Sequence, residues 1–212
     1  MKIVVFGATG GVGCRVVEQL LAAGHGVITI ARGRGRPVIQ GPGIRVVEIP
    51  DLRNAARLAP ELQGSDAVIS GIGPRSTREG PVASTVTAAI LAAMHEAGVR
   101  RLVTVSAAPV GAVPHDESLF GRLVLHPLAR RFLRPVFDDL ARMEADMQAS
   151  GLDCTAVRPP RLTNGPLTRR YRSRIGESVP RGYLISRADT AHAMCAALLD
   201  RATFGQPVGV AY

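Results

Sequence analysis

Short runs of apolar residues alternate with longer segments of helical periodicity along the whole chain. The apolar runs predict seven strands, at Ile3–Phe6, Val27–Ala31, Ile44–Glu48, Ala67–Ser70, Leu102–Ser106, Cys154–Val157 and Pro207–Ala211. The longer segments predict six helices, at Val12–Ala23, Asn54–Ala59, Val82–Ala97, Leu119–Arg134, Val136–Ser150 and Arg187–Asp200. Apolar strands that alternate with helices are typical of a parallel sheet covered on both faces. We therefore expect an α/β fold with a doubly wound parallel sheet.

The length of 212 residues suits one domain that covers residues 1–212. Two stretches that contain proline and glycine, residues 107–118 and 158–182, show neither strand nor helix periodicity. Each of them follows a predicted strand, and long loops after strand ends usually build the substrate site of a doubly wound sheet. We expect both loops to border the substrate, and the second to form a small C-terminal substrate region.

The first predicted strand runs directly into a glycine-rich turn, and a predicted helix follows at once. The turn reads Gly7-Ala8-Thr9-Gly10-Gly11-Val12-Gly13, which is GxxGxxG and differs from the GxGxxG fingerprint. Such a turn lets the backbone approach a pyrophosphate closely, and N–H groups at the helix start attract its charge. The turn predicts a dinucleotide site, with Gly7, Thr9, Gly10, Gly11, Val12 and Gly13 as cofactor-binding residues. The alternative is a tight turn that needs small residues only for packing.

Composition narrows the class of protein. Apolar residues make up 46% of the sequence, but no apolar stretch is long enough for a membrane span, and no signal-peptide pattern is present. Cys14, Cys154 and Cys195 are odd in number and lack CxxC spacing, which suits a reducing compartment. The five histidines show no metal-ligand spacing. We expect a cytoplasmic protein without a metal site.

The net charge of +9 invites a nucleic-acid or membrane hypothesis. All 26 basic residues except Lys2 are arginines, and they are scattered in small clusters. No recognition-helix, zinc-finger or RNA-binding motif accompanies them. We therefore expect a small, anionic substrate as the partner, with neither nucleic acid nor membrane, in a monomer or a dimer.

Arg32 ends the second predicted strand, where an acidic residue would bind the adenine-ribose hydroxyls of NAD. A guanidinium at this position suits a 2′-phosphate, because it forms paired, charge-assisted hydrogen bonds. Arg34 and Arg36 follow closely and would assist. Arg32 therefore predicts NADP(H) as the cofactor, although it would also fit a simple exposed arginine in an arginine-rich chain.

Three further strand ends supply candidate site residues. Asp51 and Leu52, past the third strand, would face the adenine edge, and Gly71, after the fourth, would pass beneath the ribose and diphosphate. Ser106 closes the fifth strand, at the edge where catalytic groups of such sheets collect. We expect Ser106 to contact the cofactor and to hydrogen-bond a substrate carbonyl or a bound water as a catalytic residue. A simple strand cap is the alternative.

Segments spread over nearly the whole length carry a family resemblance. They are the glycine turn, Arg32, Ser150-Gly151-Leu152, Ala156–Leu162, Gly165-Pro166-Leu167-Thr168 and Ile185–Asp189. On these segments the chain resembles the atypical short-chain dehydrogenases/reductases, in the NAD(P)H-binding, NmrA-like group, and within it flavin reductase/biliverdin IXβ reductase. The resemblance implies a Rossmann-type fold, NADPH binding, and reduction of a flat conjugated substrate such as a flavin, a quinone or a linear tetrapyrrole.

The chain departs from the family pattern at two points. Most members use a Tyr-x-x-x-Lys pair, which cannot exist here because Lys2 is the sole lysine. Flavin reductase-like relatives also lack that pair, but they carry a histidine after the double proline, where this chain has Arg161. A guanidinium stays charged at any working pH, so Arg161 cannot donate a proton and would instead clamp an anionic group.

These observations predict an NADPH-dependent reductase. The nicotinamide would lie near Pro159, Pro160 and Arg161, and a proton would come from water held by Ser106. Arg75, Arg161 and Tyr171 are the predicted substrate-binding residues. The rival is a non-catalytic NmrA-like protein that senses NADP(H), which the missing Tyr/Lys pair motivates. A sugar-nucleotide epimerase is disfavoured, because that chemistry generally relies on the same pair.

Overall fold

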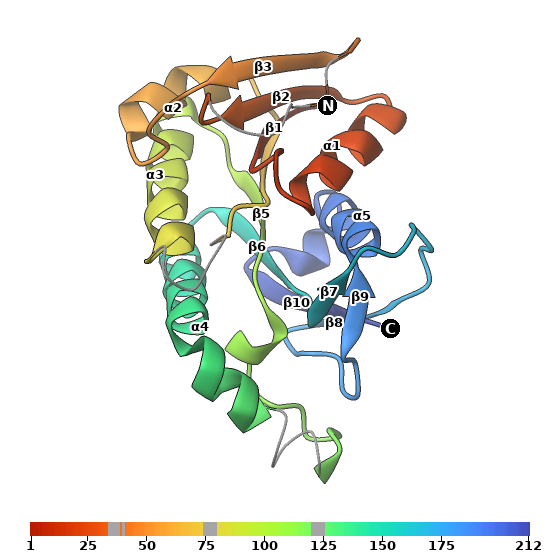
Figure 1. Cartoon of the computed structure of the whole chain (residues 1–212). Helices are drawn as coiled ribbons and strands as arrows, with labels where there is room; N and C mark the ends of the chain where they lie inside the picture. Colours follow the sequence, from red (N-terminus) through yellow and green to blue (C-terminus); the bar gives the residue numbers. More distant parts are fainter. Residues whose placement is uncertain (34–38, 40, 74–79, 120–125) are drawn as a thin grey trace.

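The computed structural model describes residues 1–33, 39, 41–73, 80–119 and 126–212, arranged as shown in Figure 1. Three arginines of the predicted site, Arg34, Arg36 and Arg75, lie outside these residues. Of the helices in the described ranges, none has both the length and the apolar composition that a membrane crossing requires.

In the described part of the chain, eight strands form the main sheet. They are β1 (Lys2–Phe6), β2 (Gly26–Ala31), β3 (Ile44–Glu48), β4 (Ala67–Ser70), β5 (Arg101–Val105), β6 (Asp153–Arg158), β8 (Arg172–Ile175) and β10 (Gln206–Ala211). Their order is β3-β2-β1-β4-β5-β6-β10-β8, and all neighbours are parallel except β10 and β8. The prediction of a doubly wound, Rossmann-type α/β sheet is confirmed, and all seven predicted strands are present.

The strand order reverses between β1 and β4, at the centre of the sheet. Phe6 lies opposite Ile30 of β2 on one side and opposite Ser70 of β4 on the other. Residues 3–6 are fully buried, because helices cover both faces of the sheet. The carboxyl ends of these parallel strands meet at one edge, where sheets of this kind usually bind ligands.

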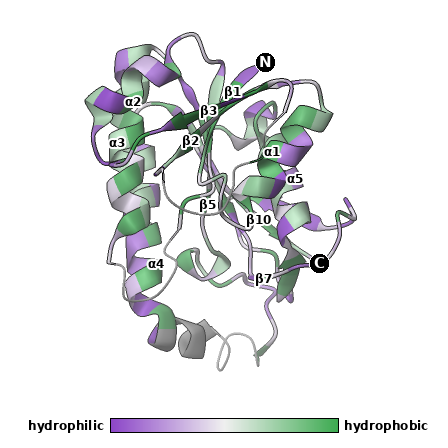
Figure 2. Cartoon of the chain, turned by 45° about the horizontal axis from the view of Figure 1, so that its top comes forward, coloured by the Kyte–Doolittle hydropathy of each residue, from purple (hydrophilic) through white to green (hydrophobic). Residues whose placement is uncertain are grey.

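Helices cover the two faces of the sheet, as Figure 1 shows. One face is covered by α1 (Gly13–Ala22) and α5 (Arg187–Ala197), and the other by α2 (Ala55–Leu62), α3 (Val82–Ala97) and α4 (His126–Ala149). Each layer buries an apolar stripe, such as Val16, Val17 and Leu20 of α1. The hydropathy colours of Figure 2 show hydrophobic and hydrophilic residues on different sides of α1. The amphipathic patterns therefore determine which helix face meets the sheet.

Two predicted helices form one bent helix. The sequence places a break at Pro135, but α4 continues through it from His126 to Ala149. Leu133 has φ −114° and ψ 20°, outside the helical range. Proline lacks a backbone N–H and its ring crowds the preceding turn, so the helix bends here instead of ending. Residues 120–125 of the first predicted helix lie outside the described residues.

The stretch 158–182, predicted to be irregular, contains two short strands. β7 (Arg161–Thr163) pairs with β9 (Leu184–Ser186) in a separate small sheet, and β8 lies at the edge of the main sheet. β7 is three residues long, and β8 is four residues long and exposed throughout. Such short or exposed strands show no clear alternation of apolar and polar residues, which is why the sequence pattern missed them. The other predicted loop, 107–118, contains one 3-10 turn, Ala108–Val110.

Asp189 ties the C-terminal region to the start of α5. Its fully buried carboxylate accepts hydrogen bonds from the backbone N–H groups of Thr168 (2.9 Å) and Arg169 (2.7 Å). It also accepts hydrogen bonds from the hydroxyls of Thr168 (2.8 Å), Ser186 (3.1 Å) and Tyr212 (2.7 Å). Burial raises the pKa of Asp189, but the hydrogen bonds outweigh it and hold this pKa below its ordinary value. The segments Gly165–Thr168 and Ile185–Asp189, which carry the family resemblance, therefore meet in a structural contact.

Candidate functional site

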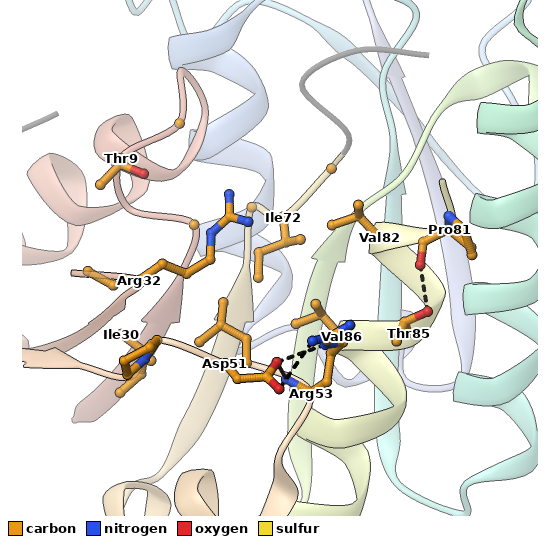
Figure 3. A pocket seen from close by; sticks show the side chains of 17 residues that line it. Thr9, Ile30, Arg32, Asp51, Arg53, Ile72, Pro81, Val82, Thr85 and Val86 are labelled. Carbon is orange, nitrogen blue, oxygen red and sulfur yellow. Dashed lines mark hydrogen bonds and ion pairs between the residues drawn. The ribbon is translucent and has the colours of Figure 1, made fainter. Parts of the chain in front are cut away.

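A cavity of about 460 Å³ lies at the carboxyl edge of the sheet, beside the point where the strand order reverses. Its walls come from the ends of β1, β2 and β4, from the segment after β3 and from the first turns of α3. Figure 3 shows the lining side chains. Seven predicted cofactor-binding residues line it: Gly7, Thr9, Gly10, Arg32, Asp51, Leu52 and Gly71.

The glycine turn requires glycine for steric reasons. Gly7 has φ +73°, and a Cβ there would lie 2.8 Å from the backbone carbon of Gly71. A Cβ at Gly13 would collide with the carbonyl oxygen of Gly7. The N–H of Gly10 donates to that same oxygen at 2.8 Å, which closes the turn. The backbone after β1 therefore passes close to the backbone after β4, and a side chain at Gly7 would separate them. A side chain at Gly13 would push the start of α1 away from the end of β1.

The start of α1 is suited to an anion. Gly11, Val12 and Gly13 lead into the helix, no side chain caps its N-terminus, and its first turn holds no acidic residue. The dipole of a helix places partial positive charge at such an end. These three residues do not line the 460 Å³ cavity itself, although Gly10, which precedes them, does.

Two arginines reach the cavity at its outer end. The Arg32 guanidinium has neither an ion-pair nor a hydrogen-bond partner among the described residues, and in Figure 3 it points across the cavity toward Ile72. Arg53 instead donates from Nε to Asp51 at 2.8 Å, and from its backbone N–H at 3.1 Å. The side-chain hydrogen bond from Arg53 lowers the pKa of Asp51. The charge of Arg53 is thus compensated by Asp51, whereas no described residue compensates that of Arg32.

Sequence reasoning missed several residues of the cavity wall. Arg53 follows Asp51 and Leu52 directly, so its position in the segment after the third predicted strand was the available signal. Val82, Thr85 and Val86 come from the first turns of α3. Their contribution depends on how α3 packs, because nothing in their local pattern distinguishes them from other residues of an apolar helix.

Ser106 lies outside this cavity, in a buried polar cluster at the ends of β5 and β6. Its hydroxyl donates to Oε1 of Glu144 at 2.5 Å, and its backbone N–H donates to the carbonyl of Val157 at 2.7 Å. Arg158 donates from Nε (3.1 Å) and from Nη2 to the same carboxylate. Only 11% of the Arg158 side chain and 8% of the Glu144 side chain are exposed. Because the Ser106 hydroxyl donates its hydrogen bond to Glu144, its lone pairs can still accept a hydrogen bond from another group.

The double proline follows β6 and lies beside the loop after β5. The carbonyl of Pro159, a buried residue, accepts a hydrogen bond from the N–H of Ala108 at 2.9 Å. Pro160 is half-buried, and Arg161, exposed, begins β7. None of Pro159, Pro160 and Arg161 lines the 460 Å³ cavity. Most predicted site residues therefore fall into two groups, one after β1, β2, β3 and β4 and one after β5 and β6.

The two predicted substrate loops contact each other. Arg174 forms an ion pair with Asp116 at 2.8 Å. The buried Glu117 carboxylate accepts hydrogen bonds from the backbone N–H of Arg181 (2.9 Å) and from the hydroxyl of Tyr183 (3.2 Å). Burial raises the pKa of Glu117, but these hydrogen bonds bring it below its ordinary value. The loops 107–118 and 158–182 are thus joined into one wall beside β5 and β6.

Tyr171 does not reach the cavity. Its hydroxyl lies 2.8 Å from Nδ1 of His192 on α5, and the two rings pack edge to face. Burial raises the pKa of Tyr171 to about 12 and lowers that of His192. Tyr171 packs against the α1 and α5 side of the core. Because its pKa is raised, Tyr171 is a poor candidate for proton donation near neutral pH.

The whole chain is similar to solved structures of bacterial proteins. A candidate exported protein from Burkholderia pseudomallei shares 26% identity at a TM-score of 0.79, with 100% of both chains covered. A candidate NADH-flavin reductase from Streptococcus pneumoniae shares 21% identity at 0.78, with 100% of this chain and 99% of that one covered. A wide-type short-chain dehydrogenase/reductase from Veillonella parvula, in complex with NADP, shares 19% at 0.80, with 100% and 94% covered. The latter two show the common fold.

The sequence comparison identifies the family. A family model described as NAD(P)H-binding matches residues 7–201, which extend from the glycine turn to the end of the α5 region. The matched span contains the cavity, the polar cluster of Ser106 and both loops. With its Rossmann-type fold, the chain belongs to the NAD(P)H-binding family.

Proposed function

We propose that the protein is an NADPH-dependent reductase that transfers hydride to a flat conjugated acceptor, such as a flavin or a quinone. The observation that carries the cofactor choice is the Arg32 guanidinium, which faces the cavity without a partner among the described residues. A guanidinium of this kind binds phosphate through paired hydrogen bonds, and a 2′-phosphate distinguishes NADP from NAD. The Veillonella neighbour with NADP supports the cofactor, and the Streptococcus neighbour supports the acceptor class.

The residues present fit a dinucleotide. The glycine turn forms a cradle that a Cβ at Gly7 would fill, and the start of α1 lies beside it. Arg32 and the Asp51–Arg53 pair would border the adenosine, and Val82 and Val86 add an apolar wall for a flat ring. Pro159, Pro160, Arg161 and Ser106 would border the nicotinamide, at the ends of β5 and β6.

The chemistry divides between the cofactor and the chain. Bound NADPH supplies the hydride, and the acceptor takes up one proton from solvent. A flavin or quinone accepts hydride readily, so the protein acts mainly by orienting the acceptor. The Ser106 hydroxyl donates its hydrogen bond to Glu144, so its lone pairs would be able to accept one from a water molecule. Such a water would direct a hydrogen toward the acceptor, and Arg161 would hold an anionic group of the substrate.

Replacement Ser106→Ala tests the role of this hydroxyl. We expect the catalytic rate at saturating NADPH to fall, while the affinity for NADPH changes less, because the water loses its acceptor. Unchanged turnover would remove Ser106 from the mechanism and leave it as a strand cap.

A second candidate function, a sensor that binds NADP(H) without turnover, follows from the absence of the Tyr/Lys pair. The only lysine, Lys2, begins β1 and donates to the carbonyl of Gln63, at the amino edge of the sheet. Tyr171 and Tyr183 are engaged by His192 and Glu117. The chain therefore lacks the acid that family members with that pair use for ketones.

One experiment separates the two functions. Steady-state NADPH oxidation is measured with FMN, a quinone and a panel of ketones as acceptors. A reductase oxidises NADPH with the flavin or the quinone and leaves the ketones unreduced. Tight NADPH binding without oxidation by any acceptor would support the sensor and overturn the reductase.

A further inference from the structure

Arg187, the first residue of α5, packs against the glycine turn. A Cβ at Gly11 would lie 2.7 Å from both Cδ and Nε of Arg187. The Arg187 side chain therefore occupies the space that a side chain at position 11 would need. The Gln19 side chain, in the C-terminal half of α1, also donates to the carbonyl of Ala188 at 2.8 Å, which joins the start of α5 to α1.

The charge of Arg187 is not compensated by the described part of the protein. Its Nη1 donates to the neutral Oδ1 of Asn164 at 2.6 Å, and it has no carboxylate partner there. The nearby Asp189 carboxylate is instead occupied by Thr168, Ser186, Arg169 and Tyr212. Arg187 is also half-buried, so water screens its charge only in part.

The position of Arg187 within its own helix makes this charge unfavourable. It is the first helical residue after the N-cap Ser186, where the helix dipole already places positive charge. A cation at this end destabilises a helix slightly, and an acidic residue would suit it better. The helix position of Arg187 therefore does not favour a positive charge. The surroundings of its guanidinium are Gly11 of the glycine turn and Asn164.

We infer that Arg187 is a further cofactor-binding residue, which neutralises the diphosphate of the dinucleotide at the glycine turn. This inference rests on the dinucleotide binding of the proposed function and assigns a new residue to it. The N-terminus of α1 and the Arg187 guanidinium flank Gly11 from two different helices, as the adjacent positions of α1 and α5 in Figure 1 indicate. A diphosphate placed there gains charge-assisted hydrogen bonds and removes the mismatch at α5. Arg32, in contrast, serves the 2′-phosphate.

The test uses ligands that carry one phosphate group or the other. Dissociation constants are measured calorimetrically for NADP⁺, NAD⁺, ADP-ribose, which has the diphosphate alone, and 2′-AMP, which has the 2′-phosphate alone. Arg187→Gln should weaken NADP⁺, NAD⁺ and ADP-ribose alike, by about 10-fold or more, and leave 2′-AMP unchanged. Arg32→Gln should show the opposite selectivity and weaken only NADP⁺ and 2′-AMP.

Two further variants complete the design. Arg201→Gln removes the same charge from an exposed residue that precedes β10 at the amino edge, and it should leave all four constants unchanged. Arg187→Lys keeps the charge but loses the planar fork, so it should restore part of the affinity. Thermal unfolding of Arg187→Gln without ligand should match the wild type or lie slightly above it, since a cation leaves the helix N-terminus.

The outcomes distinguish the inference from the proposed function. If the wild type binds the dinucleotides and Arg187→Gln binds ADP-ribose equally well, the inference is wrong and the proposed function stands. If the wild type binds neither dinucleotide, the proposed function fails and the inference fails with it. Loss of binding to 2′-AMP in Arg187→Gln would also contradict the inference, because it would indicate a general disturbance of the pocket.

Discussion

Two arginines of the same cavity carry the same charge but have different partners. The Arg53 guanidinium forms an ion pair with Asp51, whereas the Arg32 guanidinium faces the cavity and has no partner among the described residues. A phosphate would have to compete with Asp51 for Arg53, whereas among the described residues it would meet no such competitor at Arg32. The sequence position of Arg32, at the end of β2, predicts this role, but the contrast with Arg53 comes from the structure alone.

We therefore expect unequal effects from two matched replacements at this end of the cavity. Arg32→Gln should weaken NADP⁺ by about 10- to 100-fold and leave NAD⁺ nearly unchanged, because it removes charge-assisted hydrogen bonds to a phosphate. Arg53→Gln should keep NADP⁺ affinity within about 5-fold of the wild type, as expected for an exposed ion pair. Isothermal calorimetry with both cofactors measures this, and equal losses in the two variants would contradict the assignment.

Glu144 is the residue on which the buried polar cluster depends. It accepts hydrogen bonds from Ser106 and Arg158 at once. Glu144→Gln should lower the free energy of unfolding by about 3–5 kcal/mol, because Arg158 would keep a buried charge without a counter-charge. Asp138→Asn, which removes an exposed carboxylate from the same helix, should cost less than about 1 kcal/mol. Urea unfolding measures both values, and similar costs for the two variants would refute the role of burial.

At the scale of elements, the connection from β1 to α1 depends on the absence of side chains. Gly13 lies against Gly7 and Gly71, so three backbone segments meet at one point. A motif of glycines in the sequence predicts a tight turn, but the approach of the segment after β4 becomes visible only in the fold. The same glycines therefore have a packing role in the fold, and their cofactor-binding role stays a prediction.

Gly13→Ala tests this contact. We expect it to lower stability by about 1–3 kcal/mol, because the backbone must shift to admit the methyl group, and to weaken NADP⁺ binding as the turn opens. Gly73→Ala is the matched control on the same cavity wall, since a Cβ there meets no atom of the described residues within 4 Å. It should change stability by no more than about 0.5 kcal/mol. A tolerant Gly13→Ala variant would show that the turn has room to adjust.

Asp189 connects α5 to the segment before β8, and its pKa makes this connection sensitive to pH. Because the folded-state pKa lies below that of the unfolded chain, the carboxylate stabilises the fold above about pH 4. This contribution is lost as the pH falls through the lower, folded-state pKa. Asp189→Asn should cost roughly 2–3 kcal/mol at pH 7 and should lose less further stability than the wild type on acidification. Chemical unfolding at several pH values tests this, and parallel pH profiles would contradict it.

At the scale of the whole molecule, the strand order brings distant segments to one edge. The segments after β1, β2, β3 and β4 build the cavity, and those after β5 and β6 carry Ser106, the double proline and the two joined loops. A dinucleotide that spans both groups would contact both halves of the sheet. Ligand binding should therefore stabilise the molecule as a unit.

Cofactor choice is thus expected to appear in global stability. At about 100 times its dissociation constant, NADP⁺ should stabilise the fold by roughly 2.7 kcal/mol, which raises the melting temperature by about 5–10 °C for a domain of this size. NAD⁺ at the same concentration should give a smaller shift. Thermal unfolding with each cofactor measures the difference, and equal shifts would contradict the NADP preference argued from Arg32.

The sequence by itself determined the order of strands and helices, the glycine turn and the position of Arg32 at a strand end. These features depend on periodicity and on nearest neighbours, which a linear pattern records directly. It missed β7, β8 and β9, because such short strands leave weak local signals. The break predicted at Pro135 corresponds to a kink at Leu133 within α4.

Only the tertiary structure decided which distant side chains share a partner. Ser106 meets Glu144 across 38 residues, and Arg187 meets Gly11 from the opposite end of the chain. The structure also separated Tyr171 from the cavity and paired it with His192. Such contacts depend on strand order, register and helix packing, which bring residues together irrespective of their separation along the chain. For that reason the sequence predicts where a dinucleotide binds, and the fold decides which charges remain free to hold it.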